Sequence, residues 1–321
     1  MGLAILWFAV GLVLLIKGGD WFVDGAAGIA RRFRVPELLI GATVVSIGTT
    51  LPEVMVSATS AVGGHGEIAY GNAIGSIICN TALIAALTIA IRPARVDRRT
   101  LRTPVAFFFA AAVFYAAVAY LAGEFARWVG LILLGTFAVY MVVTVRQTRQ
   151  TPVEESDDEG TELSGSPFKQ VALLVVGAVL IAIGARLLVD NGTLLAKGVG
   201  VPESVIALTF VALGTSLPEL VTAITALAKG HGALSLGNII GANLFNLVLV
   251  SGAAVTLSPF ALPSEKTVAG INASLVIDVP LMLVVMLLLT VPALIRGKLS
   301  RWQGIILLAI YAAFCAFQFV M

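Results

Sequence analysis

The amino-acid sequence predicts an all-α polytopic membrane protein with ten transmembrane helices, arranged as two inverted five-helix repeats. Three observations lead to this prediction. The 321 residues are 59% hydrophobic and only 12% charged, with a mean hydropathy of +1.02, and the charged fraction is about half that of soluble proteins. Apolar runs of roughly 20 residues, the length that crosses a bilayer as a helix, recur along the chain. Residues of the first half recur in the second half at a constant offset of 166 positions.

The internal repeat includes polar residues as well as apolar ones. The tripeptide "VPE" at Val35–Glu37 recurs at Val201–Glu203. Between residues 41–80 and residues 207–246, 16 of the 40 aligned positions are identical without a gap. General similarity among apolar segments would not keep polar residues in register, so we infer a duplication.

The apolar runs divide into five spans in each half. Because five is odd, the second repeat must enter the membrane from the opposite side, which is a transporter architecture with its binding site near the membrane midplane. The predicted spans are 3–25, 37–62, 68–91, 104–122 and 126–146 in the first half, and 170–190, 203–228, 233–257, 270–294 and 303–320 in the second. The predicted organisation is a first repeat at 1–146 with its motif at 41–80, an acidic linker at 147–168, and a second repeat at 169–321 with its motif at 207–246.

The basic residues predict which loops lie on which side. Of the 20 Lys and Arg residues, 15 fall in the loops of one side, three fall in the loops of the other side (Arg127, Lys197 and Lys266), and two lie within spans (Lys17 and Arg186). Because basic residues accumulate in cytoplasmic loops, we expect both termini outside and the linker 147–168 in the cytoplasm.

Two copies of one motif place a proline and a carboxylate inside apolar spans. They are "GTTLPE" at Gly48–Glu53 and "GTSLPE" at Gly214–Glu219. A carboxylate at the centre of a transmembrane helix costs about 3 kcal/mol on insertion scales. The proline removes a backbone N–H donor, so a carbonyl one turn earlier loses its usual hydrogen bond. A bound cation would offset both costs.

The spacing within each motif predicts an all-oxygen cation site. Thr49 and Glu53 are four residues apart and would share one helix face, with Thr50 beside them. The second copy repeats this arrangement with Thr215, Ser216 and Glu219. Two carboxylates, hydroxyls and freed carbonyls suit hard cations such as Ca²⁺ or Na⁺. Neither six-residue stretch, Gly48–Glu53 or Gly214–Glu219, contains His, Cys or Met, which argues against zinc or copper.

Paired asparagines follow each motif. Asn80 and Asn246 lie in the middle of predicted spans, so we expect them to join the ligands. Asn72 and Asn238 lie near span starts, so we expect them to hydrogen-bond to neighbouring helices.

Three further polar residues receive no ligand role. His65 and His231 lie between glycines and are expected in turns. Asp278 is an intramembrane acid without a repeated counterpart. No His lies in a predicted span and no HExxH motif occurs, so we do not expect an enzyme.

Two stretches resemble the α-repeats of the cation/calcium exchanger superfamily, and most closely its sodium/calcium exchanger branch. They are "GATVVSIGTTLPEVMVSATSA" with "GNAIGSIICN", and "ALTFVALGTSLPELVTAITA" with "GNIIGANLFN". The resemblance covers essentially the whole chain in span number and repeat order. It implies that the second, third, seventh and eighth spans form a core around the ions, while the first and sixth spans slide across it to alternate access.

The resemblance also implies ligands. Glu53 and Glu219 would bind calcium side by side, helped by the carbonyls of Thr49 and Thr215. The implied sodium ligands are Ser46, Thr50, Ser76 and Asn80 on one side, and the Ala212 carbonyl, Thr215, Ser216 and Asn246 on the other. Two departures matter: family members often have Ser at the position of Ala242, and some, including potassium-dependent ones, have Asp at the position of Asn246.

The function implied by the resemblance is antiport of Na⁺ and Ca²⁺ across the cell membrane by alternating access. Its partners would be the two transported ions and the lipid bilayer, with no cofactor, nucleic acid or obligatory protein partner. Ca²⁺/H⁺ antiport stays open, because the same glutamates could carry protons. A passive cation channel is disfavoured by the inverted repeats with an acid pair at the midplane.

Overall fold

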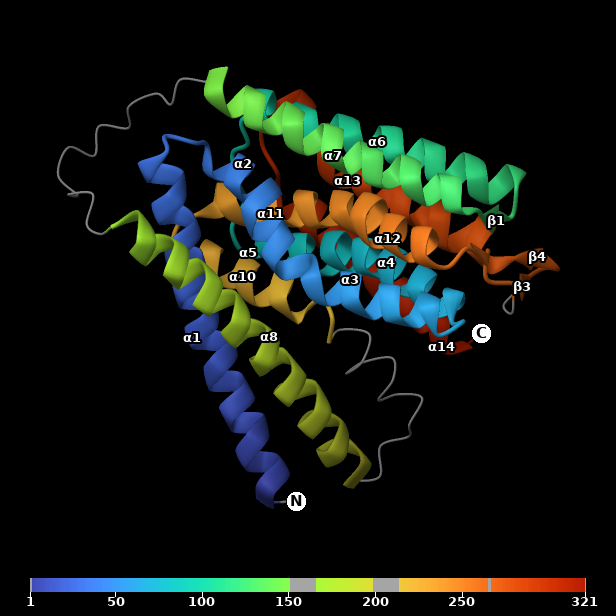
Figure 1. Ribbon diagram of the computed structural model, residues 1–321, viewed down its shortest axis with the longest axis horizontal. Helices are drawn as coiled ribbons and strands as arrows, with labels where there is room; N and C mark the ends of the chain where they lie inside the picture. The colour runs from blue at the N-terminus through green and yellow to red at the C-terminus, as the bar shows by residue number, and fades with distance from the viewer. Residues whose placement is uncertain (1, 151–165, 199–213, 265–266, 321) are drawn as a thin grey trace. The chain divides into compact units, whose positions relative to one another are not determined.

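The computed structural model describes residues 2–150, 166–198, 214–264 and 267–320, and nearly all of them are helical (Figure 1). In this described part, nine helices are long and apolar enough to cross a membrane, and a shorter apolar helix covers Leu217–Ala228. The predicted all-α membrane fold is therefore confirmed, with nine to ten spanning helices. The predicted seventh span, 203–228, is described only from Gly214 onward.

The described residues divide into two compact units, and each unit is built from both halves of the chain. Unit 1 comprises Met1–Thr49 and Val145–Asn238, and unit 2 comprises Thr50–Thr144 and Ile239–Met321. Unit 1 contains α1 (Gly2–Arg32), α2 (Glu37–Ile40), the π-helical segment η1 (Gly41–Val45), α8 (Pro167–Gly198), α10 (Leu217–Ala228), and the starts of α3 (Ser46–Val62) and α11 (Gly232–Phe245).

Unit 2 contains the remaining helices and four short strands. Strands β1 (Glu124–Phe125) and β2 (Phe260–Ala261) pair with each other, and β3 (Thr267–Val268) and β4 (Ile271–Asn272) form a hairpin. Its helical elements are α4 (Gly66–Cys79), η2 (Asn80–Ala85), α5 (Ala86–Ile91), α6 (Arg98–Leu121), η4 (Asn246–Val250), α12 (Ser251–Leu257), η5 (Ser274–Asp278), α13 (Val279–Arg296) and α14 (Arg301–Val320). Helix α7 (Arg127–Gln150) belongs to unit 2 as far as Thr144 and to unit 1 from Val145 onward.

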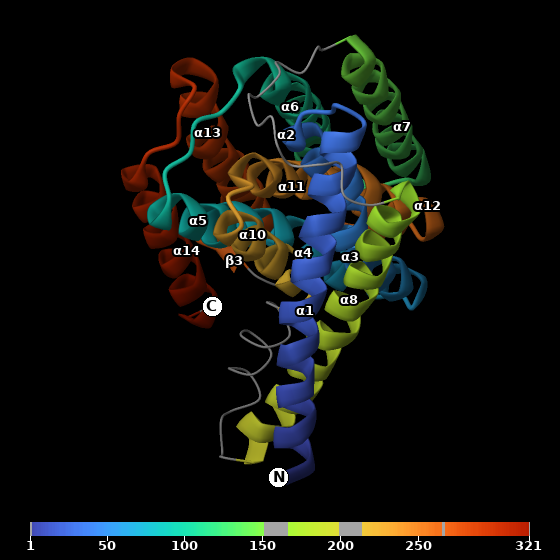
Figure 2. The ribbon, with the colours of Figure 1, turned by 90° about the vertical axis from the view of Figure 1, so that its left-hand side faces the viewer.

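In unit 1, α1 and α8 lie side by side and run in opposite directions, as Figures 1 and 2 both show. Glycines make the approach possible. A Cβ added at Gly11 would lie 2.9 Å from the carbonyl oxygen of Gly184, and one added at Gly18 would lie 3.0 Å from that of Gly177. Such close backbone contact is the usual way in which membrane helices associate, because lipid offers no hydrophobic driving force between them.

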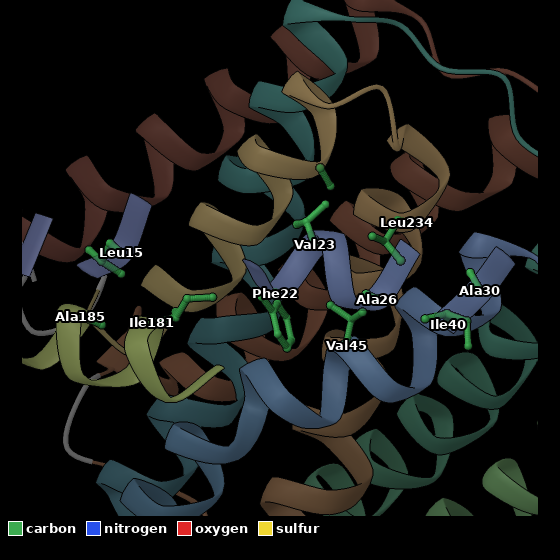
Figure 3. Close-up of a cluster of buried hydrophobic side chains, with 11 residues drawn as sticks. Leu15, Phe22, Val23, Ala26, Ala30, Ile40, Val45, Ile181, Ala185 and Leu234 are labelled. Atoms are coloured by element: carbon green, nitrogen blue, oxygen red, sulfur yellow. The ribbon is translucent and has the colours of Figure 1, made fainter. Parts of the chain in front are cut away.

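The apolar core of unit 1 packs α1 against α2, η1 and α8 (Figure 3). Phe22 of α1 is 1% exposed. Its ring would be 3.0 Å from a Cβ at Gly48, the first residue of "GTTLPE". The core residues are Leu15, Phe22, Val23, Ala26, Ala30, Ile40, Val45, Ile181, Ala185, Ala226 and Leu234.

Loops that are distant in sequence meet within each unit. In unit 1, His231 in the α10–α11 turn lies 2.7 Å from Glu37 at the start of α2. In unit 2, β1 pairs with β2, which joins the α6–α7 and α12–α13 connections. Also in unit 2, the amide of Val96 donates to the carbonyl of Gly297 at 2.9 Å, which joins the α5–α6 and α13–α14 connections.

Two features of the helices differ from the sequence prediction. Helix α1 ends at Arg32 rather than at residue 25, and α8 is helical through Gly198, the last described residue before a gap, rather than ending at residue 190. The predicted spans follow the apolar runs, which mark only the part of a helix inside the membrane. A helix continues beyond that part where no proline or turn sequence ends it. The π-helical segments η1, η2, η4 and η5 were not predicted, because one inserted residue leaves the apolar pattern almost unchanged.

The repeat-related glycines of "GNAIG" and "GNIIG" provide a stability test. A Cβ at Gly237 in α11 would lie 2.2 Å from the carbonyl oxygen of Leu38 in α2, whereas a Cβ at Gly71 in α4 would meet no described atom within 4 Å. Gly237→Ala should therefore destabilise the fold by about 1–3 kcal/mol through overpacking, whereas Gly71→Ala should be neutral or slightly stabilising. Thermal unfolding in detergent measures both, and equal unfolding temperatures for the two variants would contradict the packing.

Candidate cation site

Helix α3 presents the first motif as one buried polar stripe. The helix is continuous from Ser46 to Val62 and contains Pro52. Thr49 and Glu53 lie four residues apart in it, so they share a face, as the spacing predicts. Glu53 and Thr50 are 0% exposed and Thr49 is 2% exposed. A carboxylate buried this deeply needs polar or charged compensation.

Hydrogen bonds to Asn238 fix the first turn of α3. The single proton of the Ser46 hydroxyl is shared between the carbonyl oxygens of Gly41 at 2.7 Å and of Asn238 at 2.9 Å. The Thr49 hydroxyl donates to Asn238 Oδ1 at 3.2 Å. The prediction that Asn238 bonds to a neighbouring helix is confirmed, and Ser46 and Thr49 are brought together with it in unit 1.

Asn72 plays the equivalent part beside Glu53, in unit 2. Its Nδ2 donates to the backbone oxygen of Glu53 at 3.2 Å and to Ser57 Oγ at 2.9 Å. These bonds join α4 to α3 at the level of the buried carboxylate. The structural role predicted for Asn72 is likewise confirmed.

The second motif has a different backbone from the first. Gly214–Ser216 form a turn, and α10 begins at Leu217. Pro218 lies in the first helical turn, where its missing N–H has no intrahelical partner in any case. The expectation that Thr215 and Glu219 share a helix face is therefore wrong, because Thr215 precedes the helix.

The start of α10 nevertheless suits a carboxylate. Glu219 is 0% exposed and lies in the first turn, where the positive end of the helix dipole stabilises negative charge. Ser216 is 1% exposed, and its hydroxyl has no hydrogen-bond partner among the described residues. Thr222, three residues after Glu219, is also fully buried with a hydroxyl that lacks a partner in that part of the chain. The repeat comparison missed Thr222, because its counterpart is Val56.

Asn80 and Asn246 occupy equivalent positions in the backbone of unit 2. Each is the first residue of a π-helical segment, η2 or η4, a geometry often found at functional sites. Both are 0% exposed, and neither amide makes a hydrogen bond to any residue that the structure describes. Ser76, 5% exposed, lies one turn before Asn80. Ala242 lies one turn before Asn246 and offers only a methyl group there.

Asn243 is a buried polar residue that the sequence analysis missed. Its Nδ2 donates to Thr81 Oγ1 at 2.7 Å and lies 3.2 Å from Met286 Sδ. This contact joins α11 to η2 and α13 one turn before Asn246. The counterpart of Asn243 in the first repeat is Ile77, so repeat symmetry gave no signal.

The remaining polar residues fall elsewhere. His65 and His231 precede α4 and α11 in turns, as predicted. Asp278 lines a cavity of about 270 Å³ in unit 2 together with Glu67, Tyr70 and Ser274, which are not among the predicted ligands. Ala212 lies outside the described residues. Within residues 2–150, 166–198, 214–264 and 267–320, no group of three or more His, Cys, Asp or Glu side chains could hold a metal.

The buried amides allow ion binding to be separated from packing. Asn80→Leu and Asn246→Leu remove amides that make no hydrogen bond to described residues, so unfolding temperatures without Na⁺ and Ca²⁺ should be unchanged or higher. The stabilisation that these ions give the wild-type protein should be lost, because ligands stabilise the state that binds them.

Asn243→Leu is the matched control for these two substitutions. It breaks the 2.7 Å bond to Thr81 and should lower the unfolding temperature, at a cost of about 1–3 kcal/mol, with the ion-dependent rise retained. Thermal unfolding with and without each ion measures all three variants. An Asn80→Leu protein that is destabilised as much as Asn243→Leu, yet still responds to both ions, would contradict the ligand assignment.

Comparisons with known proteins place the chain in a family. Residues 3–146 and 169–320 match the family model described as sodium/calcium exchanger protein. The sodium/calcium exchanger MaX1 of Methanosarcina acetivorans is 30% identical over 346 residues, covering 97% of each chain. The putative antiporter CaxA of Alkalimonas amylolytica is 33% identical over 329 residues, covering 100% of this chain and 99% of CaxA. A solved structure of the sodium-calcium exchanger NCX_Mj, soaked with Na⁺ and Ca²⁺, is 32% identical with a TM-score of 0.81 over 98% of each chain. The chain belongs to the sodium/calcium exchanger family of membrane transporters.

Proposed function

We propose that this protein is a secondary active antiporter that exchanges Na⁺ for Ca²⁺ across the cell membrane by alternating access. The observation that carries the proposal is the pair of buried glutamates, Glu53 and Glu219, each in a copy of the same motif and each flanked by buried hydroxyls. NCX_Mj and MaX1, which are both described as sodium/calcium exchangers, align with almost the whole chain.

The proposed calcium ligands are the two carboxylates and the carbonyls of Thr49 and Thr215. Sodium would use the neutral oxygens around them, which are hard ligands without charge. In the proposal these are Ser46, Thr50, Ser76, Asn80, the Ala212 carbonyl, Thr215, Ser216 and Asn246. The Ser46 hydroxyl donates its proton to carbonyls, so its oxygen lone pairs stay available to an ion.

Two observations support an inverted repeat, with repeats at 1–146 and 169–321 around the linker 147–168. The first is the antiparallel pair α1 and α8. Gly11 faces Gly184 and Gly18 faces Gly177, and these are two sets of repeat-related residues in reciprocal contact. Reciprocal contact of this kind is what a twofold axis between the repeats produces.

The second observation is the pairing of loops, which supports ten membrane crossings. The contacts His231–Glu37, β1–β2 and Val96–Gly297 each join loops that the ten-span topology places on one side of the membrane. If the chain crossed the membrane one time fewer after α8, the second loop of each pair would lie on the opposite side of the membrane from the first. The excess of basic residues then assigns the termini to the outside and the linker to the cytoplasm.

The charge of the proposed site makes the exchange electrogenic. The two negative charges of Glu53 and Glu219 are balanced by one Ca²⁺ or by two Na⁺, and Asn80 and Asn246 add no charge. The remaining hydroxyls would hold a further Na⁺. Each net charge moved is worth about 2.3 kcal/mol per 100 mV, so the membrane potential should bias transport. With Asn246 neutral, potassium should not be required.

The carboxylates can be tested by one conservative substitution each. Glu53→Gln and Glu219→Gln should reduce calcium exchange at least about 100-fold, because one unit charge at contact distance contributes about 4 kcal/mol at intermediate dielectric. Glu67→Gln is the matched control, since the Glu67 side chain is 47% exposed and pairs with His65. Calcium uptake into proteoliposomes measures all three, and robust exchange by either glutamine variant of the motifs would refute the site.

The coupling ion can be tested by imposing one gradient at a time. Proteoliposomes loaded with Na⁺ should take up ⁴⁵Ca²⁺ when external Na⁺ is replaced by choline, and replacing potassium in the bath by choline should have no effect. In a separate arm, an inside-positive potential set with valinomycin should increase uptake, because net positive charge leaves with sodium. Uptake that ignores the sodium gradient and the potential but follows a pH gradient would establish Ca²⁺/H⁺ antiport instead.

A further inference from the structure

The turn between α10 and α11 holds helix α1 through a lysine. Lys229 Nζ lies 2.8 Å from Asp24 Oδ1, 3.4 Å from Asp20 Oδ1 and 3.0 Å from the backbone oxygen of Asp20. Asp20 and Asp24 are four residues apart, so they form one acidic face of α1. All three side chains are partly exposed, with 27% for Lys229 and 36% and 51% for the two aspartates.

The same turn is fixed to α2 on its other side. His231 Nδ1 lies 2.7 Å from Glu37 Oε1. Between Lys229 and His231, Gly230 has a φ of +85°, a left-handed backbone conformation that glycine adopts without strain. These two neighbours of Gly230 in the turn contact α1 and α2 respectively. Close by, a Cβ at Gly19 would lie 2.8 Å from Val221 Cγ1, so α1 also packs tightly on α10. The turn therefore connects α1 with the segment that leads into the first motif.

This connection has no equivalent in the sequence of the other repeat. The counterpart of Lys229 is Gly63, which carries no charge, and the counterpart of Asp20 is Arg186. Arg186 lies 3.7 Å from Asp190, the counterpart of Asp24, on the same helix α8. The acid on α8 is thus balanced within its own helix, whereas the acids on α1 are balanced by the turn.

We propose that Lys229 is a positioning residue that holds α1 against the α10–α11 turn and so favours one end state of the transport cycle over the other. The proposal rests on the proposed exchange by alternating access, with α1 as one of the two sliding spans that the resemblance to the sodium/calcium exchangers implies. With identical repeats, those states would be related by symmetry and equal in energy. A contact that only one repeat can make removes this equality.

The size of the bias follows from the exposure of the ion pairs. Partly exposed pairs have modest strength, so losing them should change the ratio of the two states by about two- to fivefold. This ratio governs the apparent affinity for calcium at each face, because an ion binds from a given side only in the fraction of molecules open to that side. The half-saturating calcium concentrations at the two faces should therefore shift in opposite directions.

The test measures these two concentrations in oriented proteoliposomes for Lys229→Gln and Asp24→Asn. Each variant should change their ratio about two- to fivefold, and the double variant should do no more than Lys229→Gln alone, because that substitution already removes the contact with Asp24. The charge-exchanged pair Lys229→Asp with Asp24→Lys should restore the ratio, which also excludes a simple folding defect. Lys169→Gln, which removes an exposed lysine of the same unit, should leave the ratio unchanged.

The outcomes separate this proposal from the proposed function. Sodium-dependent calcium flux in the wild-type protein, with an unchanged ratio in Lys229→Gln and Asp24→Asn, would overturn the role of Lys229 alone. Absence of sodium-dependent calcium flux in the wild-type protein would overturn the exchange function and, with it, this proposal.

Discussion

The burial of two carboxylates inside apolar helices is the constraint on which the rest of the structure depends. Glu53 and Glu219 are fully buried, and a negative charge there is tolerated only where polar groups are fixed around it. The Asn72 side chain donates a hydrogen bond to the backbone oxygen of Glu53. Glu219 lies in the first turn of α10, where the positive end of the helix dipole stabilises a negative charge. The π-helical starts at Asn80 and Asn246 add amides without ending the membrane helix. Each of these departures from a regular apolar helix is costly in lipid, and in the proposed function a bound cation would offset that cost.

Glycine packing gives these polar segments their positions. The close approach at Gly237 brings α11 against Leu38 of α2, and Gly48 lets Phe22 of α1 pack on the first motif. The same residue type joins α1 and α8, where backbones meet with no side chain between them. Van der Waals contact between backbones is a main source of stability between membrane helices, so the glycines matter to the fold as much as the acids matter to the site.

Most of the fold could be predicted from the sequence, because apolar length and the repeated polar residues are direct signals. The membrane class, the turn positions of His65 and His231, and the structural role of Asn72 and Asn238 are confirmed. The start of α10 was not predictable, since Pro218 is compatible both with a helix interior and with a first turn. Asn243 and Thr222 were missed because the apolar residues Ile77 and Val56 occupy their counterpart positions. The predicted ligands themselves stay a proposal, because ligation depends on ions and on distances between segments rather than on burial alone.

Equilibrium binding of ⁴⁵Ca²⁺ to the purified protein at increasing Na⁺ tests the central claim most directly, because it needs neither a gradient nor a transport cycle. The account predicts saturable binding of one Ca²⁺ per chain, with sodium displacing calcium more steeply than one ion for one, since at least two Na⁺ are needed to balance Glu53 and Glu219. Calcium binding that does not saturate, or that is unaffected by sodium, would contradict a shared site built on the two glutamates.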